Sequence, residues 1–120
     1  MTEADKKISK QATEESENVR MQASENPSMM LVSTHLDGRN YLSWSRSIKL
    51  ALEAKMKLGF INGKMIKPKE NSEEYEPWIK NDCLVTSWIL NSISKEIVEA
   101  FLYTTSAQEL WEDMVKATGQ

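Results

Sequence analysis

The sequence predicts a mainly α-helical fold, a small helical bundle with an extended N-terminal arm and a small hairpin. Two long segments repeat their apolar residues at spacings of three and four, the period of an amphipathic helix. Helix-start residues precede these segments, and only one short segment is rich in strand-forming residues. With 120 residues, of which 40% are apolar, the chain is long enough for one domain with a modest core.

The N-terminal part of the chain differs in composition from the rest. Residues 1–28 are rich in Glu, Ser, Gln, Lys and Asn and contain few large apolar side chains. Such a segment cannot bury enough apolar surface to offset the entropy lost on ordering. We therefore expect a disordered polar tail over residues 1–28 and a globular domain over residues 29–120. The segment MMLVSTHL that opens the domain is β-prone and bounded by Pro27 and Gly38, which predicts an extended arm.

The first helix is expected directly after the turn sequence DGRN. Asn40 is the predicted N-cap, with a side chain that accepts a hydrogen bond from an unpaired backbone N–H. Gly59 is the predicted left-handed C-cap. One face of this helix is apolar and carries Tyr41, Trp44, Ile48, Leu52 and Met56. The opposite face carries Arg46, Lys49, Glu53 and Lys57.

After this helix, FINGKMI places Asn62-Gly63 between apolar pairs, which predicts a small two-residue hairpin. A polar loop follows, and a second helix is expected to start near Ser72 or Glu76 with Pro77 at an early position. This second helix is apolar on two sides and is therefore expected to be central. One stripe has Trp78, Val85, Trp88 and Ile89, and the other has Ile79, Cys83 and Leu90.

Two further helices are expected. Ser94 is the predicted cap of a third helix that carries Ile97, Val98, Phe101 and Leu102. Ser106 and Glu109 predict a capping box for a fourth helix. That helix turns Leu110, Trp111, Met114 and Val115 inward and ends at Gly119.

The large apolar residues of these helices are the predicted core, and some are candidates for a partner surface. Four tryptophans are many for a domain of this size, and one or two could lie at a groove or a partner surface. The set comprises Tyr41, Trp44, Ile48, Leu52, Trp78, Trp88, Phe101 and Trp111.

The residues do not form a catalytic or metal-binding pattern. A zinc site needs several Cys or His ligands at short spacing, whereas this chain has one Cys, Cys83, and one His, His35. A Ser-His-carboxylate triad would rest on that single histidine in the arm, and the four glycines do not form a phosphate-binding loop. We expect Cys83 to be a buried apolar residue, and we predict a non-enzymatic chain without cofactor or metal.

Charge argues against strong nucleic-acid binding, because the formal net charge is −3. The basic side of the first helix still offers candidates for a weak contact with RNA phosphates, although a solvated helix face explains the same residues. These candidates are Arg46, Lys49 and Lys57. The glutamates at positions 70, 73, 74 and 76 are interpreted as a solvated charge run.

The sequence also bears on the cellular location of the protein. The sequence has no run of eighteen apolar residues and no secretory signal at its N-terminus, so no membrane span is expected. A single cysteine fits a reducing compartment, which favours the cytoplasm or the nucleus.

Several motifs in order resemble those of a known family. They are the Asn-Pro opening, LDGRNYLSWSR, KLGFING, WIKND leading to SWILNS, and a late Leu-Trp. Over about residues 26–120 the sequence resembles the N-terminal region of Gag polyproteins of plant copia-type LTR retrotransposons. The resemblance implies the helical first half of a Gag capsid, whose role is to self-associate into a shell around element RNA.

The resemblance also implies segments that this sequence does not contain. Gag proteins of this kind continue into a second helical half, and full-length polyproteins into a zinc knuckle, protease, integrase and reverse transcriptase. We therefore expect a domain truncated at its C-terminus, which forms weak homo-oligomers with other Gag chains and meets RNA only through missing segments. The alternative is a stand-alone relic or a host-adopted protein-binding domain with an unknown partner.

Overall fold

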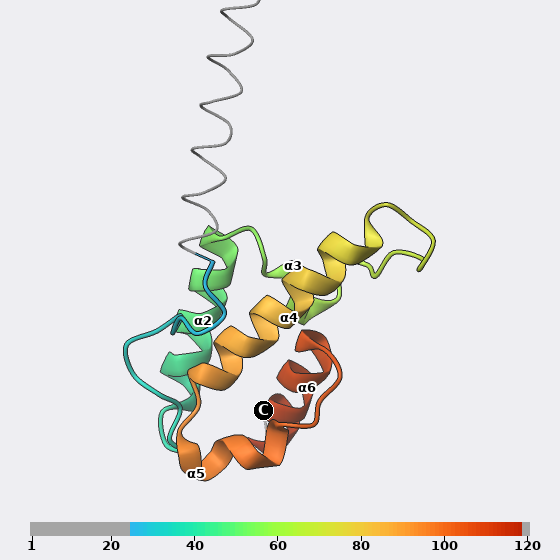
Figure 1. The fold of residues 1–120 in the computed structure, drawn as a ribbon. Coiled ribbons are helices and arrows are strands. Elements are labelled where there is room, and N and C mark those ends of the chain that lie inside the picture. Colours follow the sequence, from blue (N-terminus) through green and yellow to red (C-terminus); the bar gives the residue numbers. More distant parts are fainter. Residues whose placement is uncertain (1–24, 119–120) are drawn as a thin grey trace, which may run out of the picture.

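A computed structural model describes residues 25–118. This part of the chain folds into five α-helices and one 3₁₀-helix, η1, and it contains no sheet (Figure 1). The mainly helical fold class predicted from the sequence is confirmed. The helices, labelled as in Figure 1, are α2 (Tyr41–Ala54), α3 (Gly59–Asn62), α4 (Tyr75–Asn91), α5 (Lys95–Val98), η1 (Glu99–Phe101) and α6 (Ala107–Ala117).

The core is a single cluster enclosed by α2, α4 and α6. Helix α4 crosses the middle of the molecule, and α6 packs against both α3 and α4 (Figure 1). As predicted, the central helix starts between Ser72 and Glu76, with Pro77 as its third residue. The largest fully buried side chains are Trp88, Ile48, Leu52, Ile89, Leu110 and Met114.

Helix α2 buries the predicted stripe only as far as Leu52. The helix ends at Ala54 rather than at Gly59, and Met56 is 84% exposed, so the prediction was wrong for both Gly59 and Met56. Met56 itself takes the left-handed conformation, with φ 60°. The Lys57 N–H then donates to Leu52 O (2.8 Å) and the Met56 N–H to Glu53 O (3.0 Å), the two bonds of a Schellman C-cap.

Asn40 precedes α2 but does not cap it with its side chain. Its Oδ1 accepts from the Asp37 N–H (3.0 Å), and its Nδ2 donates to His35 O (3.0 Å). The predicted side-chain cap is therefore wrong, because this amide stabilises the preceding turn instead. Only the Asn40 carbonyl joins the helix, where it accepts from the Trp44 N–H (2.9 Å).

The predicted hairpin at Asn62-Gly63 is also wrong. These residues end the short helix α3, in which Gly63 is the left-handed C-cap with φ 80°. A two-residue hairpin and a helix C-cap both need positive φ at the glycine, so the sequence Asn62-Gly63 is compatible with either. The flanking Phe60 and Ile61 are adjacent and both buried. Two neighbours in a strand would point to opposite faces, whereas a helical turn can bury both.

Helix α6 begins as predicted, with Ser106 Oγ accepting from the Glu109 N–H (3.1 Å). The Glu109 carboxylate instead accepts from the Thr105 hydroxyl, so the box is only half formed. The predicted third helix divides into α5 and η1, which bury Phe101, and Leu102 directly after η1 is 49% exposed. The predicted stop at Gly119 lies outside the described residues.

The arm before α2 is irregular apart from one parallel bridge between Leu36 and Ile93. The Leu36 N–H donates to Ser92 O (2.9 Å), and the Ser94 N–H donates to Leu36 O (2.9 Å). The arm is thus joined to the turn after α4. Ser92 O also accepts from Trp44 Nε1 (2.9 Å), so the arm, α2 and α4 meet at one carbonyl.

The predicted tail lies outside the described residues except for its last four, Glu25 to Ser28. Asn26 O accepts from Trp88 Nε1 (2.7 Å), and Pro27 O accepts from Asn91 Nδ2 (2.8 Å). Glu25 forms an ion pair with Lys57 (3.0 Å). This segment therefore connects α4 with the end of α2.

Candidate interaction surfaces

The predicted tryptophan sites lie inside the domain. Trp44, Trp88 and Trp111 are buried, and Trp78 is half-buried. Trp44 and Trp111 stack with ring centroids 5.8 Å apart and planes tilted by 17°. The Trp78 indole N–H donates to Met65 O (3.1 Å). Three of the four tryptophans in residues 25–118 are therefore buried in the core, and Trp78 is the one that stays partly accessible.

The other predicted core residues are also placed by the structure. Ile48, Leu52 and Phe101 are buried, whereas Tyr41 is half-buried at the start of α2. The Tyr41 ring lies 6.4 Å from the Trp44 ring, centroid to centroid. Of the predicted set, Tyr41 and Trp78 are consequently the two that reach the surface.

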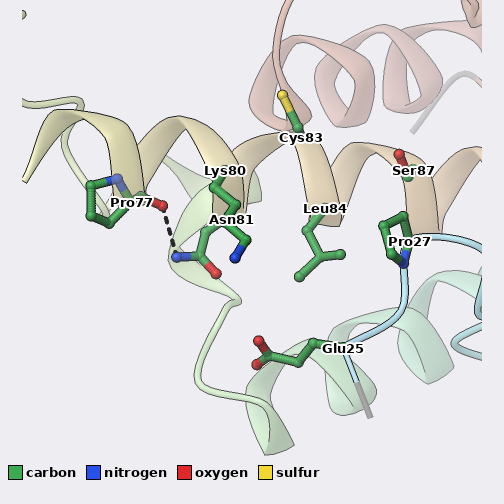
Figure 2. Close-up of a pocket in the computed structure, with 8 residues that line it drawn as sticks. All are labelled: Glu25, Pro27, Pro77, Lys80, Asn81, Cys83, Leu84 and Ser87. Atoms are coloured by element: carbon green, nitrogen blue, oxygen red, sulfur yellow. Dashed lines mark hydrogen bonds between the residues drawn. The ribbon is translucent and has the colours of Figure 1, made fainter. Parts of the chain in front are cut away.

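Cys83 is exposed, contrary to the prediction that it is buried. It lies on α4 and lines an open cavity of about 580 Å³ between α4 and the Glu25–Pro27 segment, with Leu84 and Ser87 also at its wall. Figure 2 shows Leu84 pointing from α4 toward Glu25, while Cys83 projects from the opposite side of the helix. A residue on a two-sided apolar helix is buried only where another helix covers that side, which periodicity alone does not specify.

Metal-binding clusters of three or more His, Cys, Asp or Glu side chains do not occur within residues 25–118. His35 and Cys83 are both exposed and lie on the arm and on α4. The structure does not bring the two together with a carboxylate into a metal site.

Asp82 is a buried carboxyl that sequence reasoning missed. Its Oδ1 accepts from the Ala107 N–H (3.1 Å) at the start of α6. Burial raises the pKa of Asp82, while this hydrogen bond and the positive charge of Lys67 lower it by less. An acidic residue inside the apolar pattern of the second helix was the available signal. The geometry gives Asp82 a structural task, which is to join α4 to α6.

The outward face of α2 is the first candidate surface. Leu42 is 69% exposed and Leu50 is 52% exposed, as expected for residues off the buried stripe. Arg46 is exposed between them. The Lys49 ammonium lies 5.8 Å from the centroid of the Trp111 ring. This face combines apolar side chains with positive charge on a helix held by the core.

Lys57 does not belong to that free face. Its ammonium is 3.0 Å from the Glu25 carboxylate, and its side chain is only 12% exposed. The structure therefore separates Lys57 from Arg46 and Lys49. A weak RNA contact through Arg46 and Lys49 stays a prediction.

A second surface is an open groove of about 710 Å³ between the start of α2, the α5–η1 segment and the end of α6. Tyr41, Ile97, Phe101 and Met114 contribute to its wall, and Leu42 lies at it too. Two residues after Phe101, Tyr103 is 92% exposed. Sequence reasoning named neither this groove nor Tyr103, because a groove forms only where three distant segments meet.

None of the helices within residues 25–118 is both long enough and apolar enough to cross a membrane.

Comparison with known proteins supports the resemblance seen in the motifs. Residues 22–69 match the family model described as the Gag-polypeptide of LTR copia-type. Two proteins of Arabidopsis thaliana are similar over 92 residues: the Retrovirus-related Pol polyprotein from transposon RE1, at 28% identity, and that from transposon RE2, at 29%. Each alignment covers 69% of this chain but 6% of the relative. No solved structure matches the chain significantly.

Proposed function

We propose, from the match of residues 22–69 to the copia-type Gag polypeptide, that this chain is a non-enzymatic structural module of a Gag protein. In this proposal it self-associates into capsid-type assemblies when joined to a downstream half. Its partners are other Gag chains, element RNA is contacted only through segments outside this chain, and the location is the cytoplasm. The relatives are far longer than the aligned region, so activities carried by the rest of those polyproteins are not part of the proposal.

The observation that carries the proposal is the exposed apolar face of α2. Leu42 and Leu50 are exposed, although Trp44, Ile48 and Leu52 on the other side of the helix are buried. A fixed helix loses little conformational entropy when a partner covers it. Full burial of one leucine side chain contributes about 1.5–3 kcal/mol. Two such residues are enough for weak association that many copies in one assembly would reinforce.

Sedimentation velocity over a concentration series tests this proposal. We expect the chain, extended in frame by its downstream Gag sequence, to form larger species as concentration rises. Leu42→Ser with Leu50→Ser should shift this behaviour to at least about tenfold higher concentration, equivalent to about 1.4 kcal/mol. Leu102→Ser is the matched control, because Leu102 is similarly exposed but lies after η1. A strictly monomeric extended chain would contradict the proposal.

A host-adopted binding module is the second candidate, and the groove beside Tyr41 and Ile97 is the observation that favours it. In this case the chain stays monomeric, and a partner recovered from cell extract is lost when the groove is altered by Ile97→Asp. Retention of that partner by Ile97→Asp would argue against the groove as its site.

A further inference from the structure

The segment between α3 and α4 forms a projecting loop with a charge pattern that the Gag proposal does not explain. We define residues 64–74 as the charged loop, which extends away from the packed helices at the upper right of Figure 1. Its outgoing limb carries Lys64, Lys67 and Lys69, and its returning limb carries Glu70, Glu73 and Glu74. Ile66 in the outgoing limb is 82% exposed.

The base of the charged loop is fixed to the domain. The Met65 N–H donates to Gly59 O (3.0 Å), and Met65 O accepts from Trp78 Nε1 (3.1 Å). A Cβ at Gly59 would overlap the Met65 side chain, so this close approach requires glycine. The Trp78 ring packs on Phe60 with centroids 5.5 Å apart. The next residue, Ile66, is therefore presented to solvent from a rigid base.

The charges of the loop are largely unused within the domain. The two ion pairs formed among residues 25–118 join Arg39 to Asp37 and Lys57 to Glu25, both outside this loop. Lys67 lies over the Tyr75 ring, with its ammonium 5.8 Å from the centroid. This leaves Lys64 and Lys69 on one limb and Glu70 and Glu73 on the other, exposed and without an ion-pair partner in the described part of the chain.

The equal and opposite charges of the two limbs determine which kind of partner can bind the charged loop. A polyanion such as RNA would be attracted to the lysines but repelled by the adjacent glutamates. A purely basic partner would be attracted to the glutamates but repelled by the lysines. A second copy of the same loop satisfies both limbs at once, because a two-fold axis brings residue i of one copy to residue j of the other and j to i. An axis beside the loop tip places each Lys69 next to Glu70 of the second copy.

We propose that the charged loop is a two-fold contact between copies of this chain, in which the basic limb of each copy lies against the acidic limb of the other and Ile66 is covered. The inference rests on the proposed self-association and names a surface for it. Exposed ion pairs add little affinity, typically about 0–1 kcal/mol each. These charges instead fix how the two copies are oriented, because in any other register limbs of the same charge face each other and repel. Burial of Ile66 contributes the apolar part of the contact.

Complementary charge reversal tests the contact. One variant carries Lys64→Glu with Lys69→Glu, and the other carries Glu70→Lys with Glu73→Lys. We expect each variant alone to associate at least about tenfold more weakly than the wild type, equivalent to about 1.4 kcal/mol. An equimolar mixture of the two should recover association, because each loop then faces one of opposite charge. Ile66→Ser should weaken association without altering charge.

The measurement uses the single exposed cysteine, Cys83. Chains labelled there with a donor or an acceptor fluorophore are mixed at low salt, and energy transfer is followed against concentration. Circular dichroism and thermal unfolding verify that each variant is folded. Recovery in the mixture should weaken as salt is raised, since exposed charges are screened.

A matched pair of variants on α5, η1 and α6 separates local pairing from net charge. Lys95→Glu with Lys116→Glu, and Glu99→Lys with Glu112→Lys, make the same charge changes at exposed sites. We expect this second mixture to associate no more than the wild type. Equal association in both mixtures would overturn the inference, because net charge alone would explain it.

Three further outcomes would also overturn the contact. Loop variants that associate like the wild type, while Leu42→Ser with Leu50→Ser does not, would remove the loop contact and leave the proposed function intact. A chain that stays monomeric in every test, extended or not, would remove both. Binding of poly(U) RNA by the wild type, abolished by the two lysine substitutions, would assign the basic limb to nucleic acid instead.

Discussion

The Asp82 carboxyl shows how one side chain couples two helices. Its Oδ1 accepts from the Ala107 N–H over 3.1 Å, and its burial raises the pKa above the ordinary value of 3.8. The folded state therefore binds the Asp82 proton more tightly than the unfolded state does. The ionised carboxyl costs stability at neutral pH, and this cost disappears as pH falls through the raised pKa toward 3.8.

We expect wild type to gain stability relative to Asp82→Asn as pH is lowered from 7 toward 4, measured by urea unfolding at each pH. The asparagine variant keeps an acceptor for Ala107 but has no titrating charge. Asp82→Ala should be less stable than Asp82→Asn by about 1–3 kcal/mol at every pH, because the Ala107 N–H loses its acceptor. A relative loss of wild-type stability on acidification would mean that the anion is the favoured form in the fold.

Helix ends are where sequence and structure differ most at the scale of elements. Helix α2 ends with Met56 in the left-handed conformation (φ 60°), although this side chain is 84% exposed. The conformation is costly for a residue with a Cβ and free of that cost for glycine. The early exit from the helix allows Phe60 and Ile61 to reach the core.

Met56→Gly is therefore expected to stabilise the domain, by about 0.5–1 kcal/mol after the greater freedom of glycine in the unfolded chain is included. Met56→Ala keeps the strain and should give no such gain. Thermal and urea unfolding of the two variants measure the difference. A loss of stability in Met56→Gly would show that the methionine side chain contributes more than its exposure indicates.

Ser94 and Ser106 offer a matched test of helix capping. Both are N-cap residues with extended backbone, but only the Ser106 side chain accepts a hydrogen bond from the helix, from the Glu109 N–H at 3.1 Å. Ser106→Ala should cost about 1 kcal/mol of unfolding free energy, and Ser94→Ala should cost clearly less. Equal losses would indicate that the Ser106 bond adds nothing to the stability of the domain.

At the scale of the whole molecule, the Glu25–Ser28 segment closes the domain across α4. It supplies the acceptor for the Trp88 indole N–H (2.7 Å) and the partner for the Lys57 ammonium (3.0 Å). Trp88 is fully buried at the centre of the core. The segment thus supplies a hydrogen-bond acceptor to Trp88 in α4 and an ion-pair partner to Lys57, which follows the end of α2.

A chain that begins at Met29 should be less stable than one that begins at Glu25, by about 1–3 kcal/mol, because the Trp88 N–H loses its acceptor. Both chains are acetylated at the N-terminus so that neither gains an amino charge, and unfolding is followed by circular dichroism in urea. Lys57→Ala in the longer chain measures how much of this stability comes from the ion pair between Lys57 and Glu25. Equal stability of the two chains would contradict this closing role.

Local patterns were sufficient for the helices themselves. The stripe from Trp44 to Leu52, the start of α4 near Pro77 and the Ser106 cap depend on residues within one or two turns of each other, so the sequence by itself determined them. The motifs LDGRNYLSWSR and KLGFING likewise pointed to the copia-type Gag resemblance, which the family match over residues 22–69 confirms.

Where the local sequence allows more than one structure, only the tertiary structure decided between them. Asn62-Gly63 suits a hairpin or a helix end, and burial of Phe60 with Ile61 selects the helix end. Cys83 is exposed although it lies in an apolar stripe of α4, and the Trp88 indole N–H donates to Asn26 O from a distant part of the chain. Propensity and capping act between near neighbours, whereas burial depends on segments that meet only when the chain has folded.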